Sequence, residues 1–398
     1  MRDATAQVRG ATRADTCGSG VGLRVSVGEQ GKVAKKKAIG KRRKPEREEV
    51  PAGDNTKHTM RDVARLAGVS ISTVSAVING TPKVSPVRTQ RVYEAMQSLD
   101  YQPDQIARSL KVGRSRTIGV VVPDITNAFY PEVIRGIEEA AHKSGYGVLL
   151  CDSNEDPARE KEHLSTLFSR RVDGVILACS DTSAAYDVLV ARRFPLVFVD
   201  RIPKGVRQNA VSTNNIKAAR MATRHLIDLG HKRIAVLAGD LNFSTHAERL
   251  EGFKRAMHQA GLDIPEAYLR SGNLQLEDGY EAGLELLKLK HPPTAVFASN
   301  NKLLVGLLRA VSEMHVPCPG KVSVLGFDDH VWNQHFNPRL TSVAQPTYDI
   351  GRCAFEMLLA RMEDQPLPGK QWSSIMLLDA QLKVRESTAP PASDGRKS

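Results

Sequence analysis

The chain has 398 residues, 41% of them hydrophobic, and a net charge of +12. This length allows two to four domains with packed cores, and the sequence contains neither an apolar run long enough to cross a membrane nor the apolar segment of a secretory signal, so we expect a cytoplasmic protein. Its five cysteines are too widely spaced for a zinc ribbon or zinc finger.

The excess positive charge lies at one end of the chain. Residues 1–116 contain 23 Lys and Arg against 11 Asp and Glu, whereas the rest of the chain contains 33 of each class. A basic module attached to a neutral body is typical of a protein that binds a polyanion such as DNA through one end. A solubilising extension would explain the charge alone equally well.

Residues 1–57 are poor in large apolar side chains and contain the basic clusters Lys35–Lys37 and Lys41–Lys44. Because such a composition cannot bury a core, we expect a disordered basic tail. Two interpretations stay open. The tail is either an arm that binds DNA without sequence preference, or an incidental extension that includes a reading frame started too far upstream.

Residues 58–102 carry the start and stop signals of three short helices. Thr59 and Asp62 form a capping-box pattern at the start of the first helix, which Gly68 ends. Ser70 is placed to cap the second helix. The order helix, Gly-Val-Ser turn, helix predicts a helix-turn-helix whose second helix presents short side chains to DNA. A generic three-helix scaffold with a polar surface would show the same periodicity.

The apolar face of the first helix and the segment after the third complete this module. Val63, Leu66 and Ala67 are expected to face its core. Residues 103–116 are expected to form a hinge helix and linker. The helical part, Asp104–Leu110, is about two turns long, and a helix of that length is marginal in water. We therefore expect it to be disordered away from DNA.

From residue 117 to 386 the pattern changes to short aliphatic runs that alternate with amphipathic stretches of helix length. The expected strands are Ile118–Val122, Gly147–Leu150, Val175–Ala178, Leu196–Val199, Ile234–Leu237, Ala295–Ala298 and Val322–Leu325. Near-continuous aliphatic strands between helices predict an α/β fold with parallel sheets covered on both faces. The length favours two lobes. Residues 387–398 are expected to be a disordered tail.

Several motifs in this order resemble the LacI/GalR family of bacterial repressors. They are the runs Met60–Gly80, Val84–Ser85, Tyr101–Pro103, Ala107–Leu110 and Ile118–Tyr130. The resemblance extends from about Thr59 to about Arg385. It implies a helix-turn-helix domain followed by a two-lobed domain similar to periplasmic sugar-binding proteins.

The resemblance also implies roles for residues that contact DNA. By position, the base-reading residues are Ile71, Ser72 and Ala76. The phosphate-anchoring residues are Thr59, Ser70, Thr73, Asn79 and Ser85, and Leu110 is the hinge leucine that wedges between base pairs in the minor groove. Ala76 departs from the family pattern, because many relatives carry a longer polar or basic side chain there. We therefore expect weak or purely steric base discrimination at that point.

The family's effector pocket maps to residues scattered along the body. They are Phe129, Tyr130, Arg201, Thr245, Arg249, Asn300 and Asp328. An Arg and an Asp together could give paired hydrogen bonds to vicinal hydroxyls, so we expect a sugar or sugar derivative. Two alternatives stay open: Arg249 and Asp328 could form a structural ion pair, and Phe129 could be ordinary core.

Three further positions bear on the effector. Asn301 stands where many relatives have Asp, which weakens one acidic contact. Phe243 and Leu274 stand where some purine-sensing relatives have an Arg and an aromatic residue, which counts against a purine.

Together these features predict a sequence-specific DNA-binding repressor controlled by a small molecule. We expect a homodimer, or a higher oligomer, that binds a palindromic operator in double-stranded DNA. The alternative is a sugar-binding protein without a gene-regulatory role. No nucleotide-binding glycine motif and no metal-spaced set of ligands is present, so we expect no enzyme activity, no cofactor and no metal.

Overall fold

The computed structural model describes residues 58–79, 84–102, 114–181, 186, 194–203, 209–273, 275–363 and 374–392. The expected basic tail, most of the expected hinge, Leu110 and Leu274 lie outside these ranges.

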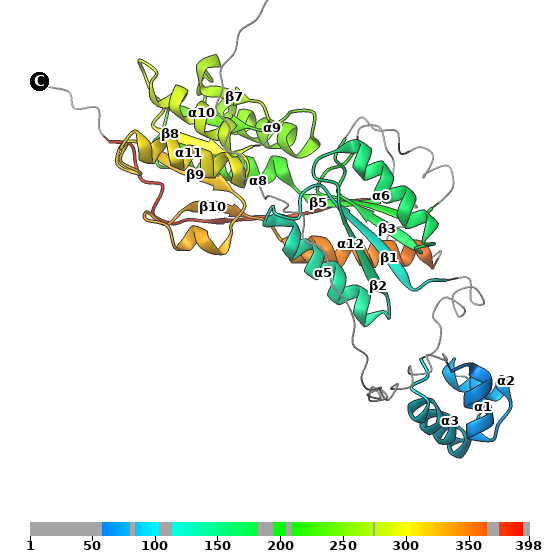
Figure 1. Ribbon diagram of the computed structural model, residues 1–398. Coiled ribbons are helices and arrows are strands. Elements are labelled where there is room, and N and C mark those ends of the chain that lie inside the picture. Colours follow the sequence, from blue (N-terminus) through cyan, green and yellow to red (C-terminus); the bar gives the residue numbers. More distant parts are fainter. Residues whose placement is uncertain are drawn as a thin grey trace, which may run out of the picture.

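Three helices form the small N-terminal module (Figure 1). They are α1 (Met60–Ala67), α2 (Ile71–Ile78) and α3 (Pro86–Ser98). The predicted signals at the ends of α1 and α2 are confirmed. Thr59 and Asp62 make the capping box, Gly68 ends α1 with a φ of 63°, and the Ser70 side chain accepts a hydrogen bond from Thr73 N.

The core of this module differs from the expectation at one residue. Leu66 is 56% exposed, whereas Ala64, one helix position away from the expected face, is buried. Val63 and Ala67 pack as predicted with Val74 and Val92 of the other helices. The second and third helices therefore approach α1 closely enough that small side chains fill the space between them.

The body contains two six-stranded sheets, each in its own lobe. The first sheet consists of β1 (Thr117–Val122), β2 (Gly147–Asp152), β3 (Gly174–Leu177), β4 (Leu196–Val199), β5 (Asn209–Thr213) and β11 (Ile375–Leu378). The second sheet consists of β6 (Ile234–Ala238), β7 (Leu269–Ser271), β8 (Ala295–Ala298), β9 (Ser323–Phe327), β10 (Thr341–Ala344) and β12 (Gln381–Lys383). All strand pairs are parallel except β10 with β12.

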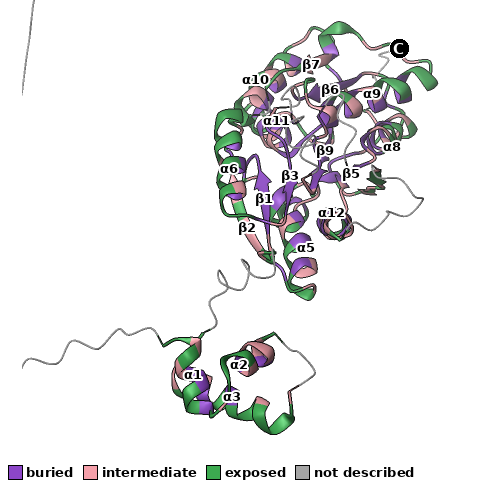
Figure 2. Cartoon of the chain, turned by 90° about the vertical axis from the view of Figure 1, so that its right-hand side faces the viewer, coloured by how far each residue is buried: buried purple, intermediate pink, exposed green. Residues whose placement is uncertain are grey.

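Helices cover both faces of each sheet, as the aliphatic strands predict, and Figure 2 shows the buried strands between them. In the first lobe, α5 (Phe129–Lys143) and α12 (Thr347–Met362) cover one face and α6 (Pro157–Ser169) covers the other. In the second lobe, α8 (Asn215–Asp228) and α9 (Ser244–Gln259) lie opposite α10 (Leu276–Leu287) and α11 (Asn301–Glu313). Single-turn helices occur at Glu266–Tyr268 (η1) and Val331–Gln334 (η2).

The chain passes between the lobes three times: from β5 to α8, from β10 to α12, and from β11 to β12. Two of these crossings are joined by a hydrogen bond of 2.5 Å from Thr213 Oγ1 to Gln345 Oε1. Three short connections at one side of the cleft restrict the lobes to rotation about that side.

The expectation of a tail from residue 387 is wrong for residues 387–392. Ser387 is fully buried, where its hydroxyl donates to Val324 O at 2.6 Å and accepts from Thr341 N at 2.8 Å. Ala389 N donates to Ser323 Oγ at 3.1 Å. This segment is short and polar, so it carries no periodic signal, yet it supplies hydrogen bonds to the ends of β9 and β10.

Glycines allow pairs of helices to approach closely in both lobes. A Cβ at Gly351 of α12 would collide with the Val133 carbonyl oxygen of α5, and a Cβ at Gly136 of α5 would collide with the Tyr348 carbonyl oxygen of α12. Gly252 lies in the same way against α8. The backbones of these helix pairs are therefore in direct contact.

We expect Gly351→Ala to lower the free energy of unfolding by about 3 kcal/mol or more, because the backbone of α5 cannot yield as a side chain could. Chemical denaturation followed by far-ultraviolet circular dichroism measures this change. Gly272→Ala is the control, since a Cβ there meets nothing within 4 Å and should change stability by less than about 0.5 kcal/mol. Equal stability of the two variants would contradict the close packing of α5 and α12.

Candidate functional site

A polar cavity of about 40 Å³, partly open to solvent, lies where the carboxyl ends of both sheets face each other. In parallel α/β sheets, ligands bind at this edge. The lining residues are Asn127, Phe129, Tyr130, Glu155, Asp200, Arg201, Thr245, His246, Arg249, Asn300, Asn301, Lys302, Asp328 and Gln345. The structure thus brings all seven residues of the predicted effector pocket together in one cavity.

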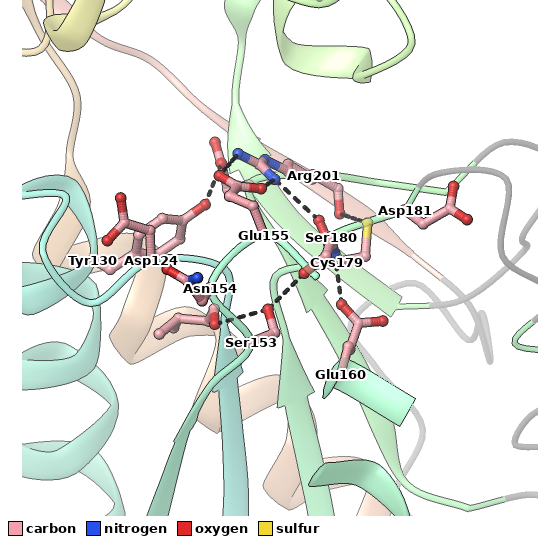
Figure 3. Close-up of polar contacts among 12 residues, drawn as sticks. Asp124, Tyr130, Ser153, Asn154, Glu155, Glu160, Cys179, Ser180, Asp181 and Arg201 are labelled. Carbon is pink, nitrogen blue, oxygen red and sulfur yellow. Dashed lines mark hydrogen bonds and ion pairs between the residues drawn. The ribbon is translucent and has the colours of Figure 1, made fainter. Parts of the chain in front are cut away.

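Arg201 follows β4 and is held by a carboxylate of its own lobe. Its guanidinium donates to Glu155 through both Nη atoms, at 2.6 and 2.8 Å, and Figure 3 shows this pair above the strand ends. The face of the guanidinium lies 4.1 Å from the ring of Phe243, which belongs to the other lobe. Arg201 is therefore a fixed contact between the lobes as well as part of the cavity wall.

A buried polar network supports the loops that carry this pair (Figure 3). Glu160 of α6 is 3% exposed and accepts hydrogen bonds from Ser180 N at 2.6 Å and from the Tyr186 hydroxyl at 2.5 Å. Ser180 Oγ lies 2.6 Å from Ser153 Oγ. Burial raises the pKa of Glu160. Because Ser153 lies in the loop after β2 that also carries Glu155, and Ser180 lies in the loop after β3, the network ties the loop of Glu155 to its neighbour.

Arg249 of α9 is buried in the second lobe. Its Nε donates to Asn215 Oδ1 and its Nη1 donates to Ser299 O, both at 2.8 Å, and its guanidinium carbon lies 3.7 Å from the ring centre of Phe327. Burial lowers its pKa, and Asp328 and Asp200 oppose that shift through their charge. Among the described residues Arg249 has no ion pair within 4.0 Å, so the alternative of a structural ion pair with Asp328 is wrong.

Two aspartates occupy equivalent places in the two lobes. Asp200 follows β4 and Asp328 follows β9, and each strand is third in its sheet. Both residues have left-handed backbones, with φ values of 60° and 77°. Such a conformation is uncommon for a residue other than glycine and is concentrated at functional sites.

The carboxylates of these two aspartates have partners inside the cavity. Asp200 Oδ2 accepts from the Tyr130 hydroxyl at 3.2 Å, and Asp328 Oδ1 accepts from Gln345 Nε2 at 2.5 Å. Burial raises the pKa of Asp200.

Polar contacts join the lobes around the cavity. Lys302 Nζ of the second lobe lies 2.8 Å from Asp124 Oδ2 of the first, and Asn301 Nδ2 donates to Asn127 Oδ1 at 2.8 Å. Asn301 therefore spans the cleft instead of supplying the acidic contact that an Asp would give. A rearrangement of the lobes would have to exchange these contacts with water or with a ligand.

Three of the predicted pocket residues also have structural roles. Asn300 caps α11 by accepting from Leu303 N at 2.7 Å. Phe129 and Tyr130 pack edge to face, with ring centres 5.1 Å apart, in the core of the first lobe. The interpretation of Phe129 as core is therefore correct, although its ring also lines the cavity.

Sequence reasoning missed several lining residues, namely Asn127, Glu155, Asp200, His246, Lys302 and Gln345. Asp200 could have been found from its place at a strand end, beside Arg201. Glu155 and Lys302 follow no strand directly, and only their partners across the cavity identify them.

The predicted DNA-binding residues that the structure describes lie at the surface of the N-terminal module. Ile71, Ser72 and Asn79 are exposed and Ala76 is half-buried along α2. Local contacts orient some of these groups: Asn79 Nδ2 donates to Ser75 O at 2.7 Å. Ser85 is exposed at the start of α3, so its hydroxyl can be reached by a phosphate, whereas the hydroxyl of the exposed Thr59 at the start of α1 donates to Asp62 Oδ2 at 2.7 Å.

Comparison with known proteins gives matches over both parts of the chain. Residues 59–104 match the model for bacterial regulatory proteins of the lacI family, and residues 223–388 match that for a periplasmic binding protein-like domain. The ribose operon repressor of Escherichia coli K12 is 37% identical over 311 residues, which cover 78% of this chain and 94% of that protein. The repressor PurR of Vibrio cholerae is 37% identical over 309 residues, which cover 77% and 92%.

Solved structures agree with these matches. The lac repressor dimer bound to operator and an anti-inducer has a TM-score of 0.75 and 27% identity, covering 83% of this chain and 99% of that chain. A LacI family regulator from Enterococcus faecium with bound ribose has a TM-score of 0.60 and 32% identity, covering 69% and 100%. In the described part of the chain, no helix is long and apolar enough to cross a membrane.

We expect Glu155→Gln to lower the free energy of unfolding of the body by about 2 kcal/mol or more, because the side chain of Arg201 is only 6% exposed and would lose its anionic partner. Urea denaturation measures the loss. Glu285→Gln is the matched control, since its pair with Arg270 is exposed at the carboxylate and should contribute less than about 1 kcal/mol. A loss no larger than that of the control would contradict the role of Glu155.

Proposed function

The chain belongs to the LacI family of bacterial regulatory proteins, and on that premise we propose that it is a homodimer that binds a palindromic operator and releases it when a neutral sugar binds between the lobes. The chain is a DNA-binding transcriptional repressor with a small-molecule effector, as are its relatives, and not an enzyme. Its proposed place of action is the cytoplasm, where the operator is.

The charge balance of the cavity favours a neutral effector. Its lining contains three carboxylates and three cationic side chains: Glu155, Asp200, Asp328, Arg201, Arg249 and Lys302. Arg201 is paired with Glu155, Lys302 is paired with Asp124, and Arg249 donates to two uncharged oxygens. An anionic effector would have to displace a carboxylate. The hydroxyl groups of a neutral sugar could instead donate hydrogen bonds to the carboxylates and accept them from the cationic side chains.

Similarity to the two ribose-linked proteins supports a small sugar as the effector class. A purine is the second candidate, because the PurR relative is as similar as the ribose operon repressor. The position of Phe243 counts against it: its ring lies against Arg201 and is absent from the cavity lining, so it offers no stacking surface to a base.

The proposed DNA surface is α2 with the starts of α1 and α3. Ile71, Ser72 and Ala76 would face base edges in the major groove, while the exposed hydroxyls and the helix starts would hold phosphates. Thr59, Ser70, Thr73, Asn79 and Ser85 remain the proposed phosphate anchors, and the Leu110 wedge remains a prediction from the family. The surplus of basic residues before residue 117 would strengthen binding to any DNA.

One experiment tests both halves of the function. Genome-wide footprinting identifies the operator, and a gel-shift assay on that operator is then titrated with D-ribose, other neutral pentoses and hexoses, ribose 5-phosphate and hypoxanthine. Release by a neutral sugar is the expected result. Release by hypoxanthine or by the phosphorylated sugar alone would overturn the neutral-sugar assignment, and the absence of any operator would overturn the regulatory one.

We expect Asp328→Ala and Arg249→Ala each to weaken the effector response by about 10- to 100-fold, because each removes charge-assisted hydrogen bonds to the ligand. Operator affinity without effector should change little, since both residues lie in the cleft. The measurement is the sugar concentration that releases half of the operator. Asp379→Ala is the control, because Asp379 is exposed and paired with Lys217 outside the cavity. A normal response in either cleft variant would remove that residue from the pocket.

The proposed dimer is supported by an exposed apolar group near η2. Val331 is 74%, Trp332 44% and Phe336 40% exposed, and the three lie within one short segment. Aromatic side chains gathered in this way are typical of the centre of a protein interface. The lac repressor that matches this chain is a dimer, and a second copy of the chain is the partner that a two-fold operator requires.

We expect Phe336→Asp to raise the dissociation constant of the dimer at least about tenfold, because a charge would be buried against an apolar surface. Sedimentation velocity over a range of concentrations measures it. Val384→Asp is the control. Val384 directly follows β12 and is 59% exposed, so the substitution should leave the dissociation constant unchanged. A wild-type monomer at micromolar concentration that still footprints one half-site would contradict the dimer itself.

A further inference from the structure

His246 stands out among the cavity residues because one of its polar atoms is not satisfied. It lies in the first turn of α9, is 4% exposed and lines the cavity. Its Nδ1 is enclosed and forms no hydrogen bond with the described residues. Buried polar atoms in native proteins nearly always have a partner, so a water or a ligand group would satisfy this nitrogen.

The surroundings of His246 keep its imidazole neutral. Burial lowers its pKa well below the ordinary value, and the guanidinium groups of Arg249 and Arg201 lower it further. The other charged or titratable groups of the cavity come from the elements on all sides: Tyr130, Glu155, Asp200, Lys302 and Asp328. Phe243 packs against the imidazole with its ring centre 6.4 Å away and contributes no charge.

A neutral imidazole has a specific chemical preference. Each ring nitrogen is either a donor or an acceptor according to the tautomer, and a hydroxyl group can serve as either partner. A protonated imidazole would donate only, and would favour an anion. The neutral ring therefore matches a hydroxyl of a polyol better than a phosphate or carboxylate.

We propose that His246 is an effector-binding residue, whose unpaired Nδ1 forms a hydrogen bond with a hydroxyl of the sugar, and that it makes sugar binding sensitive to pH. The inference rests on the proposed function of the cleft. It assigns to one residue both a preference for hydroxyl groups and a dependence of sugar affinity on protonation.

The direction of the pH dependence follows from the geometry. Opening of the cleft would hydrate the imidazole and so remove the burial that lowers its pKa. In the closed cleft a proton on His246 would add a third cation beside Arg201 and Arg249, so closure around the sugar must release that proton. Affinity for the sugar is therefore full where the open form is already neutral, and it falls by up to tenfold for each pH unit below the pKa of the open form.

The test uses the full-length protein and D-ribose, or the neutral sugar of the panel that binds best. Isothermal titration calorimetry at pH 7.5 and 5.5 is run on wild type, His246→Phe, His246→Asn and His258→Phe. His258 is exposed on the same helix and serves as the matched control. Operator binding without sugar reports that each variant is folded.

We expect His246→Phe to bind the sugar about tenfold or more weakly at pH 7.5, as the loss of one buried hydrogen bond implies. His246→Asn keeps a polar group near the place of Nδ1 and should recover most of that affinity. Both variants should lose the fall in affinity between pH 7.5 and 5.5, while wild type and His258→Phe keep it. Titrations in buffers of different ionisation heat should show proton release at pH 6 in wild type and none in His246→Asn.

Wild-type affinity and a wild-type pH profile in His246→Phe would overturn the inference and leave the proposed function standing. If His246→Phe does not fold, the test rests on the number of protons that His246→Asn releases when the sugar binds. Release equal to that of wild type overturns the inference. If wild-type protein binds no neutral sugar of the panel, the proposed function fails first, and the inference fails with it.

Discussion

The buried positive charge of Arg249 constrains the whole cleft. Only 4% of this residue is exposed, and an unbalanced charge at such depth would cost several kcal/mol. Asn215 and the Ser299 carbonyl accept from its guanidinium, while Asp200 and Asp328 supply negative charge from opposite lobes. Because one carboxylate belongs to each lobe, the electrostatic free energy of Arg249 depends on how the lobes are set against each other.

The two lobes have the same architecture, and each supplies one of the two aspartates that balance the charge of Arg249. Their strands follow the same order, and Asp200 and Asp328 stand at equivalent strand ends with the same left-handed backbone. Three crossings between the lobes lie close together, and Thr213 and Gln345 are joined there by a hydrogen bond. A ligand in the cleft would contact the same groups that hold the lobes together. It would shift the equilibrium between the open and closed arrangements of the lobes by the difference in its binding free energy for the two.

Local structure could be predicted where a physical signal lies within a few residues. The capping box of Thr59 and Asp62 and the left-handed Gly68 determine where α1 begins and ends, and the aliphatic strands of both sheet centres are recognisable by their composition. The strands β5, β7, β10, β11 and β12 were missed, because β5 and β10 carry Asn, Ser and Thr and β7 and β12 are only three residues long. Their partners, not their composition, make them strands.

Local propensity and motifs of fixed spacing were enough to predict the helix-turn-helix and the alternation of strands and helices, whereas the seven cleft residues came from the resemblance to a known family. What those seven residues contact depends on the folded arrangement of the chain. The pairing of Arg201 with Glu155, the bridge from Lys302 to Asp124 and the unsatisfied Nδ1 of His246 join or isolate groups far apart in the chain. Such relations depend on how the strand-end loops of one lobe meet each other and how the two lobes meet in space, and no local pattern encodes the distance between side chains so far apart in the chain.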